Sequence, residues 1–202
     1  MAAILPVRLR GLIVLLSACW VWVAPAHADS LPGPTVDFTG TMVIRYPPAQ
    51  PLTIRIDYTS QRVRRELAAF GTRFVTIVDR TKDRTVMLFP DLKRYSIRPL
   101  DPDAHDTVKS LARGAALERV GPETLGGVDT VKFRLQGRSP RGRTFAGFLW
   151  LTPHNIMIRM EGQSTVGGKA RQLVIEMKDL RSGAVYPAVF DIPAGYEKVK
   201  PK

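Results

Sequence analysis

Between Leu52 and Tyr58 every second residue is apolar, and the residues between them are threonine, arginine and aspartate. Side chains on a β-strand point to opposite faces in turn, so this alternation predicts a half-buried strand. A similar run at 42–46 precedes it. Prolines at 47, 48 and 51 lie between the two runs, which predicts a hairpin with a proline-stiffened connection.

The same alternation predicts further strands along the chain. They are expected at 62–68, 73–79, 85–89, 92–98, 131–135, 144–151, 156–160 and 173–177. Short breaks separate them, including 126–127, 137–142 and 163–168. Parallel pairing needs longer and usually helical crossovers, so the pattern predicts a mainly β protein with one antiparallel sheet of many strands.

One segment between the strands has a different period. Asp101 and Pro102 are typical of a helix cap and first turn, and apolar residues follow at helical spacing up to Gly114, a plausible stop. The pattern predicts a short amphipathic helix at 102–113. Val108 and Leu111 would be its apolar contacts with the sheet.

The polar sides of several predicted strands carry basic residues. If one sheet holds these strands, its outer face is basic and its inner face is apolar. The basic residues are Arg45, Arg55, Lys132, Arg134 and Arg159. A single short helix is little cover for such a face, so either the sheet curls and fills its own interior or it keeps a cavity. The candidate cavity-lining residues are Ile54, Ile56, Phe133, Trp150, Ile158 and Ile175.

The first residues of the chain predict export. Arg8 and Arg10 precede the apolar run 11–23, and a small-x-small sequence ends at Ala28. This arrangement is typical of a secretory signal peptide, and the apolar run is shorter than the roughly 20 residues that span a bilayer. We therefore expect residues 1–28 to be removed before Asp29 and residues 29–202 to form one domain in the periplasm of a Gram-negative bacterium.

A second processing route starts from the one cysteine. Leu16 to Cys19 matches the lipobox of bacterial lipoproteins, in which the cysteine is lipidated and becomes the N-terminus. The apolar run continues past Cys19, however, where a polar linker is expected, so cleavage after Ala28 is favoured. The mature chain would then hold no cysteine, and its stability would depend on a hydrophobic core rather than on disulfides.

The net charge of the predicted mature chain indicates which classes of partner it could bind. Removing Arg8 and Arg10 from 30 basic residues leaves 28, against 18 acidic ones, for a net charge of +10. In an exported protein such a balance favours anionic envelope surfaces over nucleic acid, but it agrees at least equally well with a well-solvated surface that binds neither. Basic residues are spread along the chain without interleaved aromatic residues, so single-strand binding is not expected.

No arrangement of residues predicts catalysis or a cofactor. The segment from Asp101 to His105 and Asp106 is explained more simply by a helix start than by a metal site. His154 is expected in an exposed turn. The segment 163–170 lacks the first glycine of a phosphate-binding loop and has Ala170 where serine or threonine is required. Nucleophile-elbow and zinc-protease motifs are absent. We expect no enzyme activity, no metal and no cofactor.

Several segments of the sequence resemble those of a known protein family. They are the opening strand from Phe38 to Met42, then Met87–Tyr95, Val120–Phe133, Phe148–His154 and Phe190–Val199. Together they resemble the superfamily of periplasmic proteins similar to the outer-membrane lipoprotein carriers, the Lol-type fold. The resemblance implies an incomplete antiparallel β-barrel with a helical lid over an apolar cavity. In the carriers that cavity holds lipoprotein acyl chains, but no ligand-binding residue can be transferred by motif.

Two hypotheses follow. The first is a monomeric carrier-like protein that binds a lipid or an acylated protein in its half-barrel cavity. The alternative is an envelope interaction or stress-regulatory protein whose core is filled and whose basic face docks on a partner or an anionic surface. An empty apolar cavity would distinguish the first from the second.

Overall fold

The computed structural model describes Leu31 and residues 33–69, 71–100, 115–138, 144–166 and 168–200. The predicted signal peptide with its cleavage site at Ala28 and Asp29, the alternative lipidation site Cys19, and the predicted helix with Val108 and Leu111 lie outside these residues. Those predictions are not tested by the structure.

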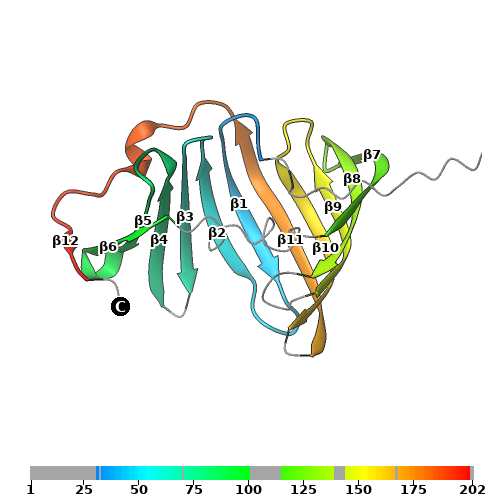
Figure 1. Cartoon of the computed structure of the whole chain (residues 1–202), viewed down its shortest axis with the longest axis horizontal. Helices are drawn as coiled ribbons and strands as arrows, with labels where there is room; N and C mark the ends of the chain where they lie inside the picture. The colour runs from blue at the N-terminus through cyan, green and yellow to red at the C-terminus, as the bar shows by residue number, and fades with distance from the viewer. Residues whose placement is uncertain are drawn as a thin grey trace, which may run out of the picture.

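The described strands form one sheet of twelve, in the order β12-β6-β5-β4-β3-β2-β1-β11-β10-β9-β8-β7 (Figure 1). The strands are β1 (Phe38–Arg45), β2 (Leu52–Tyr58), β3 (Arg62–Ala69), β4 (Thr72–Asp79), β5 (Arg84–Phe89), β6 (Arg94–Pro99), β7 (Ala116–Leu125), β8 (Val128–Arg138), β9 (Thr144–Leu151), β10 (Met157–Val166), β11 (Lys169–Ser182) and β12 (Glu197–Lys198). Short 3-10 helices are η1 (Arg80–Lys82), η2 (Pro90–Leu92) and η3 (Pro187–Phe190).

The sheet consists of two meanders joined in the middle. The N-terminal half-sheet is β1–β6 and the C-terminal half-sheet is β7–β11, and β11 returns to pair antiparallel with β1. β7 and β12 are at the two edges and do not meet, so the sheet is open. Twelve described strands in an open, curved sheet confirm the predicted mainly β, antiparallel incomplete barrel. The two-residue β12 differs, because it runs parallel to β6.

The strand predictions were wrong in several details. Leu92 lies in η2 and not in the strand predicted at 92–98, and β12 was not predicted. β7 was not predicted, because its residues are mostly exposed and its apolar positions do not alternate cleanly. The break predicted at 163–168 lies mostly within strands, since β10 continues to Val166 and β11 begins at Lys169. This hairpin is formed by backbone pairing from Arg159↔Glu176 to Val166↔Lys169, which needs no alternating apolar face. The phosphate-loop-like segment is therefore an ordinary hairpin.

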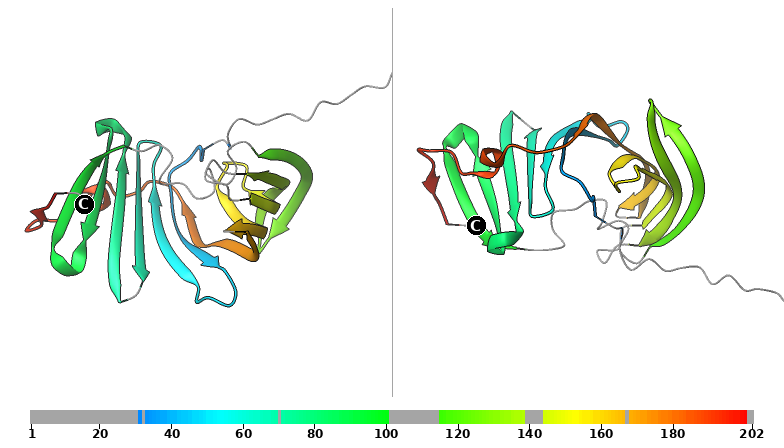
Figure 2. Two further views of the ribbon diagram at one scale, coloured as in Figure 1. Left: turned by 60° about the horizontal axis from the view of Figure 1, so that its bottom comes forward. Right: turned by 90° about the horizontal axis from the view of Figure 1, so that it is seen from above.

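The C-terminal half-sheet curls around its own inner face (Figure 2). Side chains from four of its strands and from β1 meet there in one core, in which the most deeply buried are Leu135, Leu149, Met160, Leu173 and Ile175. Gly147 and Gly162 lie opposite each other on β9 and β10. A Cβ at Gly162 would lie 2.2 Å from the Ala146 carbonyl oxygen, so this close approach requires glycine.

The N-terminal half-sheet is covered on the opposite, outer face. After β11 the chain crosses this half and reaches β12 at its far edge (Figure 1). Val185 and Phe190 from this segment pack on a core formed by Val75, Ile77, Val86 and Leu88. The covering segment thus supplies the second layer that a sheet needs to bury an apolar face.

Among the described residues, no helix has the length and apolar character needed to cross a membrane.

Candidate ligand pocket

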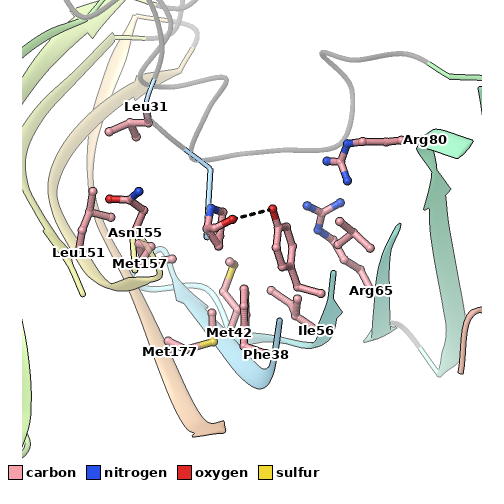
Figure 3. A pocket seen from close by; sticks show the side chains of 13 residues that line it. Leu31, Phe38, Met42, Ile56, Arg65, Arg80, Leu151, Asn155, Met157 and Met177 are labelled. Atoms are coloured by element: carbon pink, nitrogen blue, oxygen red, sulfur yellow. Dashed lines mark hydrogen bonds between the residues drawn. The ribbon is translucent and has the colours of Figure 1, made fainter. Parts of the chain in front are cut away.

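A pocket lies on the inner face where the two half-sheets meet (Figure 3). Its volume is about 90 Å³. It is lined by Leu31, Pro34, Phe38, Met42, Ile56, Tyr58, Val63, Arg65, Arg80, Leu151, Asn155, Met157 and Met177. Most of these side chains are apolar, and they come from both half-sheets and from the segment that precedes β1.

Neighbouring central strands form the apolar floor. Met42 on β1 lies opposite Ile54 on β2 and Met177 on β11, and Phe38 stacks on Tyr58 with ring centroids 5.0 Å apart. Alternation along each strand then places the remaining floor side chains on the same face. Three of the lining residues are methionines, whose unbranched thioether side chains adapt to irregular or changing shapes.

The segment before β1 forms one wall of the pocket. The Thr35 backbone N–H donates to the His154 carbonyl at 3.0 Å, and the Asn155 side-chain amide donates to the Gly33 carbonyl at 3.4 Å. The Tyr58 hydroxyl donates to the Pro34 carbonyl at 3.3 Å (Figure 3). These contacts hold residues 33–35 between the β9–β10 turn and β2. His154 is exposed in that turn, as predicted.

Two arginines lie on one side of the pocket. Arg65 is on β3 at an inner-face position, directly opposite Ile56, and Arg80 is the first residue of η1. Figure 3 shows both guanidinium groups on this side, with Leu31, Leu151 and Met157 on the other. The thirteen lining residues include no aspartate or glutamate. The pocket is therefore apolar at one end and positively charged at the other.

The structure separates the six predicted cavity residues. Ile56 lines the pocket, and Ile54 packs beside it against two of the core clusters. Ile175 is fully buried and Phe133 partly buried in the core of the C-terminal half-sheet. Ile158 is buried outside the three core clusters.

Trp150 is on the outer face. It lies opposite Lys132 and Arg159 in the neighbouring strands, and the Lys132 ammonium lies 4.7 Å from its ring centroid. The same ammonium lies 4.6 Å from the Phe148 ring. These cation–π contacts cover the indole, which explains how a tryptophan on the polar face is only 3% exposed.

The strand register places all five predicted basic residues on the outer face, but beside carboxylates. Arg45 hydrogen-bonds Glu176, and Arg159 contacts Glu176 at 3.1 Å and Glu161 at 2.6 Å. The remaining three of the five basic residues form the pairs Arg55–Asp57, Lys132–Glu123 and Arg134–Glu118. The hydrogen bond from Arg45 holds the pKa of Glu176 below its ordinary value. All five predicted basic residues are therefore in ion pairs with carboxylates.

Sequence reasoning missed most of the pocket, although one signal was present. Arg65 interrupts an apolar alternation between Val63 and Leu67, so a charge stands where β3 otherwise faces inward. Met42 and Met177 were assigned to apolar strand faces but not to a cavity. Leu31, Pro34 and Arg80 lie in segments without periodicity, and only the tertiary structure brings them to the pocket.

Among the described residues no group of three or more histidine, cysteine, aspartate or glutamate side chains could hold a metal ion. The acidic segment Asp101–Asp106 with His105 lies outside those residues.

No family model matches the chain, and no curated protein matches its sequence. Solved structures do. An uncharacterized conserved protein from Thermus thermophilus is 15% identical with a TM-score of 0.55, over 82% of this chain and 91% of that one. The chain therefore shares the fold of that protein.

Weaker matches, with TM-scores below 0.5, include one protein named as a LolA superfamily member and MucB. The LolA superfamily protein NE2245 from Nitrosomonas europaea is 9% identical with a TM-score of 0.38, over 83% of this chain and 95% of that one. MucB of the Pseudomonas aeruginosa MucA/MucB complex is 19% identical with a TM-score of 0.49, over 80% of this chain and 56% of that chain. This chain thus spans little more than half the length of MucB.

Proposed function

We propose that this protein is an exported, carrier-like protein that shelters an acyl chain of a lipid or an acylated protein in the inner-face pocket. The observation that carries the proposal is the pocket itself, an apolar site at the junction of the two half-sheets. Burial of each methylene contributes about 0.8 kcal/mol, so burial of about ten methylenes of an acyl chain corresponds to roughly 8 kcal/mol, the free energy of micromolar binding.

The small volume of the pocket is consistent with partial entry of a chain. About 90 Å³ is below the roughly 300–1,000 Å³ of sites that enclose a drug-sized molecule. Rearrangement of Met42, Met157 and Met177 would enlarge it at little cost, because methionine has several accessible rotamers. The ligand would therefore displace these side chains rather than enter a rigid cavity.

The alternative hypothesis, docking of an anionic surface on a basic outer face, has less support. The basic side chains on that face are paired with carboxylates, which lowers the local positive charge available to a partner. The predicted export to the periplasm belongs to the proposal, since the residues that would direct it lie outside the described part of the chain.

The test compares two adjacent positions on β1 that face opposite sides. Met42→Trp would fill the pocket, and Val43→Trp places the same side chain on the outer face. We expect wild-type protein purified from the periplasm to carry acyl lipid, detected by native mass spectrometry and lipid extraction. The Met42→Trp variant should carry much less lipid, and Val43→Trp should carry as much as wild type. Circular dichroism confirms that both variants fold. Absence of lipid from wild-type protein, together with no binding of added dodecanol, would refute the carrier function.

A further inference from the structure

The chemistry of the pocket extends the proposed function to a class of ligand. From the pairing of an apolar floor with Arg65 and Arg80, we infer that the ligand is a single-chain amphiphile with an anionic head group, a carboxylate or a phosphate. The head group would bind the two guanidinium groups, and the acyl chain would extend toward Leu151 and Met157. This inference rests on the proposed function, since it concerns the same pocket.

The position of Arg65 on its strand is the first reason. Val63 and Arg65 both line the pocket, and Val63 is only 1% exposed. The partner positions across the sheet are Ile56 and Thr76. A guanidinium on a face of this kind is costly to desolvate, and an anionic ligand would add to the acceptors that the fold supplies. Arginine is also the side chain best suited to bind a planar carboxylate or a phosphate through paired hydrogen bonds.

The second reason is the charge around the arginines. Arg80 reaches the same end of the pocket from η1, and its guanidinium donates to the Ser60 carbonyl at 3.4 Å, a long contact that leaves further N–H donors available. Among the described residues that line the pocket there is no carboxylate to neutralise this end. The nearby Asp79 forms its contacts elsewhere, with Thr81 at 2.6 Å and Arg84 at 3.5 Å.

The amphipathic layout fixes the orientation of the ligand. The aliphatic side chains of Leu31, Leu151 and Met157 lie across the pocket from the arginines (Figure 3). A neutral chain could use only the apolar part, and a free anion only the charged part. A ligand that satisfies both ends is therefore expected to bind more tightly than either fragment.

Four probes separate these contributions: dodecanoate, dodecyl phosphate, 1-dodecanol and inorganic phosphate. Binding to the mature protein is measured by isothermal titration at pH 8 and below the micellar concentration. We expect both anionic amphiphiles to bind about tenfold more tightly than dodecanol, as hydrogen bonds to charged groups allow. Inorganic phosphate should bind at least a hundredfold more weakly than dodecyl phosphate.

Variants assign the preference to the arginines. Arg80→Gln and Arg65→Gln should each weaken dodecanoate binding severalfold more than dodecanol binding. Arg65→Lys should recover part of it. Arg73→Gln is the matched control, because it removes one charge from an exposed outer-face position on β4. The control should bind like wild type.

The outcomes distinguish the two levels of the proposal. Equal affinities for dodecanoate and dodecanol, or equal losses in Arg73→Gln and Arg80→Gln, would overturn the head-group inference and leave the acyl pocket standing. If neither amphiphile binds, the proposed function itself fails. If inorganic phosphate binds as tightly as dodecyl phosphate, the site binds a free anion and the acyl inference is wrong. Since Arg80 is exposed, its variant tests the proposal even if Arg65→Gln does not fold.

Discussion

The two half-sheets bury their apolar residues in different ways. The C-terminal half-sheet curls and packs inner-face side chains against one another, and Leu135, Leu149 and Met160 are fully buried in the resulting core. The N-terminal half-sheet relies on Phe190 and its neighbours to cover the outer face of β4–β6. Its inner face keeps half-buried side chains such as Phe74 and Met87. The pocket lies at the boundary between the packed inner face of the C-terminal half-sheet and the less covered inner face of the N-terminal half-sheet.

The difference shows what produces a cavity in a single sheet. Curvature brings inner-face side chains together and excludes space, whereas a layer on the outer face stabilises a sheet without closing its inner side. A protein that combines both in one sheet can hold a stable core beside an open apolar site. Variants of each half should therefore affect stability and binding in different proportions.

The largest expected effect is loss of the outer cover. Phe190→Ala should lower the free energy of unfolding by about 4 kcal/mol, because Phe190 is 6% exposed and packs on four buried aliphatic residues. Urea denaturation measures the loss. Tyr186→Ala is the control, since Tyr186 is 74% exposed beside η3, and should change stability little. In hydrogen exchange β4–β6 should lose protection before β8–β11; simultaneous loss in both halves would contradict their separate stabilisation.

A smaller loss is expected at the glycine pair of the curled half. Gly162→Ala should cost about 3 kcal/mol, because its Cβ would overlap backbone atoms of β9 that cannot move aside. The matched change is Gly40→Ala on β1, whose Cβ would meet the Met177 sulfur at 2.7 Å. That flexible side chain can shift toward the pocket, so Gly40→Ala should weaken dodecanol binding more than it weakens folding. Equal destabilisation by both changes would refute this distinction.

Glu176 joins the two halves on the outer face, and its effect depends on pH. Its folded-state pKa is lowered, chiefly by the hydrogen bond from Arg45. The stabilisation is therefore complete above the pH at which an unfolded glutamate ionises, roughly 4.3, and is lost as pH falls through the lower folded-state pKa. Glu176→Gln should cost about 1 kcal/mol at pH 7, allowing for solvent screening.

The measurement is urea denaturation of both proteins between pH 7 and pH 3. The difference between wild type and Glu176→Gln should shrink on acidification. Glu197→Gln is the control, because Glu197 is 79% exposed and 4.0 Å from Arg94, and it should show no such trend. A difference that stays constant at low pH would mean that the charge of Glu176 contributes nothing.

The smallest expected change is spectroscopic. Carbon-13 methyl spectra of methionine-labelled protein should show dodecanoate shifting Met42, Met157 and Met177, which line the pocket. The methyl resonances of Met87 and Met160 should not shift, since these residues do not line the pocket. Fluorescence of Trp150 should change little on binding, because its ring is on the outer face beside Lys132. A large change in Trp150 emission would mean that the ligand binds on the outer face, which would contradict the proposal.

Much of the fold could be predicted from the sequence. Period-two alternation identified most strands, the breaks between them implied antiparallel pairing, and the same alternation sorted Arg45, Arg134 and Arg159 onto one face. These features depend on local backbone geometry, which neighbouring residues specify. β7 was missed because an exposed edge strand buries too little on either side to leave an apolar pattern.

Pairing across the sheet and the pocket depended on the tertiary structure. Alternation predicts that Trp150 and Phe133 lie on opposite faces only if it is known which residues of each strand point inward. The continuous apolar run 144–151 does not show which of its residues do so. Some neutralising partners of the outer-face arginines are distant in sequence, as Arg45 and Glu176 illustrate, whereas Asp57 and Glu161 are two residues from Arg55 and Arg159. Leu31, Arg80 and Asn155 are also distant in sequence, and only the tertiary structure brings them together at the pocket. The chain alone determined which residues prefer burial, and the long-range pairing of β1 with β11 decided which of them enclose a space.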